Sequence, residues 1–286
     1  MAYRVTGDPD FRWPNGARIA VMLTFDFDAE TLQESRFKER ISFGDRSRGE
    51  YGPGEGLKRC LRVLDARQVK GTFFVPGVVA ERYPDHVRQI AEASHEIACH
   101  GYAHETELGI PRETEAANLA KTEELLAAIS GKKPIGHRAP GSIMQMYEAD
   151  LLHERGYLYS SSMKNCDWAY CYERDGKKIP LVEFPADYYL DDFSFFYFTL
   201  GVPRHKTTYT VEYVREIWQD EFDGLAEEGN KIMCLKLHPQ LIGRASRAKM
   251  LEELIGYMQA NGAWIATCEE VARYVLKYNG FEEVQA

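Results

Sequence analysis

Apolar positions along the chain form short continuous runs that alternate with segments of helical periodicity. Residues 19–25 are apolar at nearly every position, a pattern typical of a strand buried on both faces of a parallel sheet. Leu57, Leu61 and Leu64 follow at helical spacing, and residues 71–76 form a second run rich in β-forming residues. This order of strand, helix and strand predicts a βαβ unit.

The same alternation continues to the end of the chain. About seven βα repeats without a change in composition predict one α/β barrel, with a doubly wound open sheet as the alternative. Residues 36–56 are rich in Gly, Arg and Glu with little periodicity, and predict a long loop, either a functional rim or a disordered segment. Further strands are expected over 96–99, 135–138, 157–161, 181–185, 232–237 and 263–267, and helices over 57–67, 84–93, 113–130, 149–155, 210–228, 245–260 and 269–278.

Composition narrows the classes of partner. Hydrophobic residues make up 44% of the 286 positions and charged residues 28%, which are ordinary globular values. A net charge of -9 argues against nucleic acid and anionic membranes as partners. No apolar run reaches the roughly 18 residues of a membrane span, and the N-terminus lacks the apolar core of a signal peptide. We therefore expect a cytoplasmic protein, in which the six scattered cysteines are reduced.

Two histidines stand four residues apart directly after a short apolar run. Four residues of extended strand would separate His100 and His104 by roughly 13 Å, too far for one metal ion, whereas a tight loop or helical turn brings them onto one face. Gly101 lies between them and gives the backbone the freedom to turn. The spacing predicts a metal-binding pair at the end of a strand.

Asp26 and Asp28 lie two residues apart at the end of the first strand. If the strand is still extended there, both carboxylates face the same way, roughly 6–7 Å apart. Such a pair can also cap the following turn. Together with the two histidines, however, one carboxylate completes a three-ligand metal set that leaves positions for water and substrate. A metal bound in this way activates water and polarises a carbonyl, so the pattern predicts hydrolysis, with the second carboxylate acting on the water.

Arg138 and His238 follow two other expected strands. Arg138 can pair with Asp26, keeping that carboxylate ionised and oriented, although a surface arginine before a proline turn is the alternative. His238 is placed to act as a general acid, although a single strand-end histidine is often structural. Barrel enzymes assemble their active sites at the carboxyl ends of the strands, so we expect all these side chains to meet there.

Four motifs in this order resemble those of the polysaccharide deacetylase family, carbohydrate esterase family 4. They are T-F-D-F-D at 24–28, H-G-Y-A-H at 100–104, R-A-P at 138–140 and L-K-L-H-P at 235–239. The resemblance spans about residues 18–275 of a single catalytic domain over 1–286. It implies a distorted (β/α)7 barrel that hydrolyses an N-acyl bond with one divalent metal, usually Zn²⁺.

The resemblance also implies a role for each matching residue. Metal ligands would be Asp28, His100 and His104. Asp26 would be the base, oriented by Arg138, and His238 the acid. The backbone N–H of Gly141 would help to hold the oxyanion.

Two departures from the family pattern affect the expected substrate. First, one residue separates the two acids of the first motif, as in a branch that resembles peptidoglycan-deacetylase-like and allantoinase-like members. Second, the segment 237–244 resembles the corresponding segment of allantoinase-like and cyclic-imidase members. The usual Asp-Trp motif is only suggested by 165–168, which makes Trp168 a candidate substrate-site residue. We therefore expect hydrolysis of a small cyclic imide or amide. The alternatives are an N-acetyl sugar or peptidoglycan deacetylase and a binding protein that retains the barrel without catalysis.

Aromatic residues are unusually dense in two segments, 168–172 and 188–198. They can form a narrow apolar wall around a small ring, or a subunit interface, because exposed aromatic patches mark contacts. We expect a closed pocket and a homo-oligomer, either a dimer or a tetramer.

Overall fold

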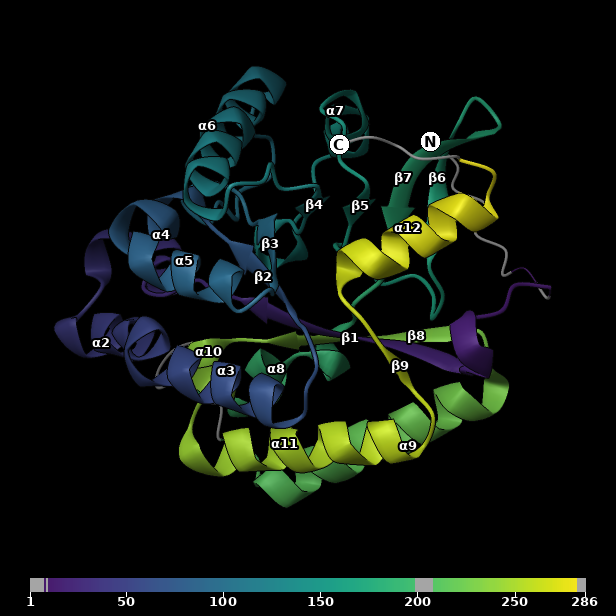
Figure 1. The fold of residues 1–286 in the computed structure, drawn as a ribbon. Helices are drawn as coiled ribbons and strands as arrows, with labels where there is room; N and C mark the ends of the chain where they lie inside the picture. Colours follow the sequence, from purple (N-terminus) through teal and green to yellow (C-terminus); the bar gives the residue numbers. More distant parts are fainter. Residues whose placement is uncertain (1–7, 9, 199–207, 282–286) are drawn as a thin grey trace.

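The computed structural model describes residues 8, 10–198 and 208–281. Its sheet curls into an incomplete barrel surrounded by helices (Figure 1), which confirms the predicted distorted (β/α)7 barrel. Seven strands run parallel in the order β7-β5-β4-β3-β2-β1-β8. They are β1 (Ile19–Asp26), β2 (Thr72–Val75), β3 (Glu96–Cys99), β4 (Gly136–His137), β5 (Tyr159–Ser160), β7 (Lys177–Glu183) and β8 (Lys231–Leu237).

Most of the connecting helices begin and end within about two residues of the predicted ranges. Gly131, at a φ of 75°, ends the long helix α6 in the left-handed conformation that favours glycine. A capping box of Thr267 and Glu270 starts the last helix, α12. The predicted helices are observed as α3 (Leu57–Ala66), α5 (Pro84–Glu92), α6 (Arg112–Ser130), α7 (Glu148–Glu154), α9 (Val211–Glu228), α11 (Ala245–Ala260) and α12 (Cys268–Tyr278).

The loop predicted over residues 36–56 is wrong, because the segment is largely helical. Ser42 caps one of its helices by accepting a hydrogen bond from the backbone N–H of Asp45 at 3.1 Å. Gly49 packs so closely on the chain after β1 that an added Cβ would lie 2.6 Å from the Ala29 carbonyl oxygen. Tertiary packing thus stabilises helices that periodicity does not reveal. The segment contains the end of α1 (Thr31–Phe37) and all of η2 (Lys38–Arg40), α2 (Phe43–Tyr51) and η3 (Gly52–Gly56).

Several short elements were not predicted. The largest is a hairpin in which β6 (Tyr170–Arg174) pairs antiparallel with β7. Its turn residues Asp175 and Gly176 both have positive φ, and Asp-Gly is a strong hairpin signal that the sequence contains. The other unpredicted elements are the helices α4 (Gly77–Arg82), α8 (Asp192–Phe196), α10 (Pro239–Ile242), η1 (Pro14–Gly16), η4 (Pro140–Ser142) and η5 (Tyr188–Leu190). The strand expected over 263–267 is observed as the shorter β9 (Trp264–Ile265), which pairs with β1.

Alternate side chains of β1 enter two different parts of the core. Val21 and Leu23 belong to the cluster shared with the outer helices, including α9 and α11, which lie side by side in Figure 1. Ala20 and Met22 belong to an inner cluster with side chains of α12 such as Val271. Every position of β1 is buried, as expected for a strand covered on both faces. Apolar side chains therefore fill the inner cluster beneath the polar carboxyl ends of the strands.

His95 makes the stability of the fold depend on pH. Its ring is 8% exposed, and Nδ1 accepts a hydrogen bond from the Gly71 backbone N–H at 3.2 Å. Burial, with a smaller contribution from the charge of Lys70, lowers the pKa of His95 to about 4. Because a histidine in an unfolded chain has a pKa of about 6.5, the unfolded state takes up a proton first as the pH falls.

We expect the free energy of unfolding to fall by about 2–3 kcal/mol between pH 6.5 and 4 because of His95 alone. Urea unfolding midpoints across this range measure the effect. The variant His95→Asn keeps an acceptor near Nδ1 but does not titrate, so its stability should fall less steeply. If the free energies of unfolding of the wild type and the variant fell equally with pH, His95 would not be the titrating group.

Two further expectations concern the whole chain. All six cysteines are free, and all except Cys166 are buried, which agrees with the prediction of reduced thiols. Within the described residues, no helix combines the length and hydropathy needed to cross a bilayer.

Candidate active site

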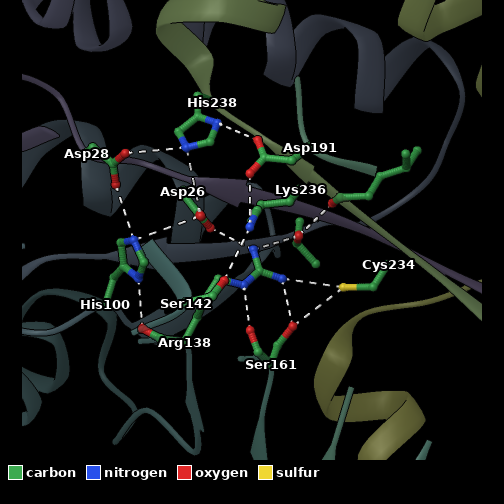
Figure 2. Close-up of polar contacts among 12 residues, drawn as sticks. Asp26, Asp28, His100, Arg138, Ser142, Ser161, Asp191, Cys234, Lys236 and His238 are labelled. Carbon is green, nitrogen blue, oxygen red and sulfur yellow. Dashed lines mark hydrogen bonds and ion pairs between the residues drawn. The ribbon is translucent and has the colours of Figure 1, made fainter. Parts of the chain in front are cut away.

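Polar side chains meet at the carboxyl ends of four parallel strands (Figure 2). These positions are the ends of β1, β3, β4 and β8. In the sheet β4 is next to β3 and β1 is next to β8, with β2 between the two pairs. The structure thus brings together all six charged or titratable residues expected in the site: Asp26, Asp28, His100, His104, Arg138 and His238. Of the other two expected residues, Gly141 lines the pocket that opens onto this site and Trp168 does not.

A tight loop after β3 brings the two histidines together, as their spacing predicted. The chain turns at Gly101, which has a φ of 65°. An added Cβ there would lie 2.7 Å from Glu105 Oε2 and 3.0 Å from Pro140 Cγ, so both the conformation and the space require glycine. The centroids of the His100 and His104 rings lie 5.2 Å apart.

Asp28 and the two histidines direct ligand atoms at one point. One atom from each of the three residues lies within 4.8 Å of the other two. His100 Nε2 is 3.5 Å from Asp28 Oδ1, and His104 Nε2 is 3.8 Å from Asp28 Oδ2. The Nδ1 atoms bond elsewhere, that of His100 to the Arg138 carbonyl at 2.8 Å and that of His104 to Ser35 Oγ at 3.0 Å. In a histidine that binds a metal through one ring nitrogen, the other ring nitrogen typically makes a hydrogen bond of this kind.

The protonation and hydrogen bonding of this triad fit a divalent cation. Asp28 is fully buried, and neither carboxyl oxygen has a hydrogen-bond partner in the described part of the chain. Burial raises the pKa of Asp28, because an uncompensated carboxylate is costly in the interior. Burial also lowers the pKa values of His100 and His104 to about 3 and 4. Their imidazoles are therefore neutral, as metal ligands must be.

Arg138 holds the second acid of the site. Its Nη1 lies 2.7 Å from Asp26 Oδ1. The guanidinium also donates to Thr24 Oγ1 at 2.9 Å, Ser161 Oγ at 2.8 Å, the Ser161 carbonyl at 3.1 Å and Cys234 Sγ at 3.4 Å. Burial disfavours the charged carboxylate, but Arg138 and the nearby histidines outweigh it and hold the pKa of Asp26 well below its usual range. The other oxygen, Oδ2, lies 3.8 Å from His100 Nε2. Asp26 is thus an ionised, oriented carboxylate beside the triad.

His238 faces the triad from the end of β8 and is held by Asp192. Its Nδ1 lies 2.7 Å from Asp192 Oδ1, and its backbone N–H donates to Asp192 Oδ2 at 3.0 Å. Burial opposes a charge on the ring, but Asp192 and Asp191 outweigh it and raise the pKa of His238 to about 10. Nε2 lies 3.6 Å from Asp28 Oδ2. A protonated imidazole near the triad is suited to donate a proton.

The turn that carries His238 is packed directly onto the segment 52–56. Gly56 and Gly243 both approach the backbone of Pro239 so closely that neither has room for a Cβ. Arg59 Nη1 adds a hydrogen bond to the Gly243 carbonyl at 3.1 Å. The position of His238 therefore depends on η3 and α10 together.

A pocket of about 280 Å³ opens onto these groups. Gly141 is among its lining residues, with a φ of 61°. Three charged residues that sequence reasoning missed also line it, namely Arg36, Asp191 and Lys236. The Nζ of Lys236 and the Oδ2 of Asp191 lie 2.9 Å apart. The full lining is Asp26, Leu32, Ser35, Arg36, His100, His104, Thr106, Gly141, Ser142, Tyr188, Asp191, Phe193, Lys236 and His238.

The structure does not bring Trp168 to this pocket, so its predicted place in the substrate site is wrong. Its ring lies 5.1 Å from the Nζ of Lys231, the first residue of β8, whereas His238 follows the last. Seven strand residues separate the two ends by roughly 20 Å. Trp168 instead lines a separate hollow of about 340 Å³ near Trp13. The partial match at 165–168 was too weak to place it.

The aromatic segment 188–198 is mainly an internal wall. Phe195, Phe196 and Tyr197 are buried in the core, while Tyr188 and Phe193 line the pocket. Most of the aromatic density is thus used within one chain. The homo-oligomer stays a prediction.

Fold and site together define a class of protein, an α/β-barrel hydrolase with a candidate metal centre at the carboxyl ends of its strands. Residues 49–160 match the family model described as polysaccharide deacetylase. A crystal structure from Mycobacterium smegmatis, assigned to the polysaccharide deacetylases, is 35% identical, with 96% of each chain covered and a TM-score of 0.89. The chain belongs to the polysaccharide deacetylase family, whose enzymes hydrolyse non-peptide carbon–nitrogen bonds and depend on a metal.

Two other proteins are similar to the chain over most of its length. A peptidoglycan deacetylase of Helicobacter pylori is 27% identical over 285 residues, which are 91% of this chain and 97% of that protein. The structure of Puue allantoinase is 23% identical with a TM-score of 0.80, and 93% of this chain and 92% of that chain are covered. The likeness to the allantoinase concerns the fold alone.

Proposed function

We propose that this enzyme removes the acetyl group from an N-acetylated amino sugar, such as those of peptidoglycan. One observation carries the proposal: Asp26, oriented by Arg138, and the protonated His238 face the same triad of ligand atoms. The peptidoglycan deacetylase of H. pylori supports this substrate class. So does the peptidoglycan deacetylase-like protein FGM2 of Gibberella zeae, 27% identical over 293 residues, with 91% of this chain and 87% of that protein covered. The alternative named from the sequence is therefore better supported than the cyclic imide.

Asp28, His100 and His104 would hold the divalent metal, for which we propose Zn²⁺ because of the two imidazoles. When bound, such an ion polarises the amide carbonyl and lowers the pKa of a water. Asp26 accepts a proton from the attacking water as the new C–O bond forms. The Gly141 backbone N–H, at the wall of the pocket, would then stabilise the oxyanion.

His238 completes the reaction at the leaving group. It donates a proton to the amide nitrogen while the C–N bond breaks, so the products are acetate and a free amine. Asp192 holds Nδ1 at 2.7 Å, which leaves the Nε2–H directed at the triad. Asp192 is therefore a positioning residue for the acid.

The size of the pocket is also compatible with a second candidate function. At about 280 Å³ it is at the lower limit of common ligand pockets, which hold roughly 300–1,000 Å³. It admits one small group at a time, either the acetamido end of a sugar or a small cyclic imide. Hydrolysis of a cyclic imide is the second function that the site can accommodate.

Parallel assays of the Zn²⁺-reconstituted enzyme distinguish deacetylation of an amino sugar from hydrolysis of a cyclic imide. The substrates are chito-oligomers, peptidoglycan fragments, allantoin, hydantoin and succinimide, with released acetate, free amine and ring opening as readouts. We expect acetate and amine in equal amounts from the sugars, and no activity in the metal-free enzyme. Ring opening without acetate release would replace the proposed function by the second candidate.

A further inference from the structure

A second cluster of potential metal ligands lies beside the active site. None of its three residues takes part in the proposed reaction. It consists of Glu115 in α6, His137 in β4 and Glu148 at the start of α7. All three residues are buried, with exposed fractions of 6%, 1% and 2%. One ligand atom from each lies within 4.8 Å of the other two, the same limit that the Asp28 triad meets.

Three polar atoms of this cluster have no hydrogen-bond partner among the described residues. Within the described residues, neither ring nitrogen of His137 has a hydrogen bond, and Glu148 Oε1 has none either. His137 Nδ1 lies 3.4 Å from Glu148 Oε1. The remaining oxygen, Glu148 Oε2, accepts from the Gln145 backbone N–H at 2.7 Å. Since buried polar groups are almost always satisfied, these atoms point to a ligand.

A third cluster of potential metal ligands differs, because cationic side chains of the protein already pair with its carboxylates. Asp191, Asp192 and His238 also lie within 4.8 Å of one another. There, however, Asp192 binds His238 at 2.7 Å and Asp191 binds Lys236 at 2.9 Å. No lysine or arginine of the described residues forms an ion pair with Glu115 or Glu148. The carboxylates of the third cluster are therefore paired with Lys236 and His238, whereas the described residues provide no lysine or arginine for Glu115 and Glu148.

A small cavity adjoins the two glutamates. Its volume is about 10 Å³, and Glu115, Glu148, Ala139 and Pro140 are among its lining residues. This is roughly the space that one water-sized particle occupies. The cavity thus has room for a single ion and no room for an organic ligand.

We propose that Glu115, His137 and Glu148 bind a second divalent cation. Two carboxylates balance its charge, and one imidazole favours Zn²⁺, Co²⁺ or Ni²⁺ over Mg²⁺ and Ca²⁺. The ion would join α6, β4 and α7 directly behind the segment that carries Arg138. Its role would be structural, and the proposal does not rest on the proposed function.

Metal stoichiometry tests the proposal. The chain is stripped with a chelator, reloaded with Zn²⁺ or Co²⁺ alone, freed of unbound ion by gel filtration and subjected to elemental analysis. We expect two ions per wild-type chain, one in Asp28→Asn, one in Glu148→Gln and none in the double variant. Glu123→Gln is the matched control, because Glu123 also lies buried in α6 but binds Arg155 at 2.8 Å; it should keep two ions.

Thermal unfolding gives a second readout without turnover. Because an ion that binds only the folded state stabilises it, Zn²⁺ should raise the melting temperature of Asp28→Asn by a few degrees and should leave the double variant unchanged. A folded Asp28→Asn protein that binds no ion would overturn the proposal. If Glu148→Gln does not fold, the stoichiometry of Asp28→Asn alone decides.

Discussion

Replacing Asp26 with asparagine should lower turnover by about 10²- to 10⁴-fold while leaving the metal content unchanged. Asparagine has nearly the same shape, but it cannot accept the proton of the attacking water. Arg138 still meets an oxygen at this position, so the orientation of the side chain is preserved. Acetate release from a chito-oligomer and elemental analysis of the same preparation measure the two effects.

The control for this substitution is Asp220→Asn, which removes a carboxylate from an exposed position of α9. It should show wild-type activity and metal content. If Asp26→Asn kept activity within tenfold of the wild type, Asp26 would not be the base. If it lost the metal together with the activity, Asp26 would be a ligand instead.

Replacing Asp28 with asparagine should weaken metal binding at the triad by more than about a hundredfold and abolish turnover at ordinary metal concentrations. Only two neutral imidazoles then remain at this position. The same change should raise the melting temperature of the metal-free protein, because it removes a buried carboxylate whose two oxygens have no partner in the described residues. Metal titration followed by thermal unfolding measures both outcomes.

The variant Ser35→Ala should show a smaller loss of metal affinity than Asp28→Asn. It removes the 3.0 Å bond to His104 Nδ1 but keeps all three ligands, so we expect a loss of metal affinity of about 10- to 100-fold. Equal affinities of wild type and Asp28→Asn at this site would exclude Asp28 as a ligand. A lower melting temperature of the metal-free Asp28→Asn protein would show that Asp28 stabilises the fold without metal.

Local patterns predicted much of the fold. The continuous apolar run of β1 marks a strand that is buried on both faces, and the predicted bounds of α11 agree with those observed. The polar residues that follow the strands could be placed in one site, since parallel strands end at the same edge. Asp26, His100 and Arg138 are examples of this rule.

Contacts between segments that are distant in the sequence explain where the observed structure differs from the predicted one. Residues 42–51 lack a clear apolar stripe, and α2 is held by close packing of Gly49 on the chain after β1. Asp192 lies in an aromatic segment with no motif, and only the fold places it beside His238. Trp168 belongs to a partial motif, but its ring lies against Lys231, at the opposite end of β8 from His238.

The close packing of Gly56, Gly243 and Pro239 has a consequence for protein engineering. The helices of residues 31–56 border the pocket through Leu32, Ser35 and Arg36, and their last turn leaves no space between itself and the turn that follows His238. A new substrate entrance grafted from a relative would therefore have to include both segments. Exchanging one without the other would displace the proton donor along with the rim.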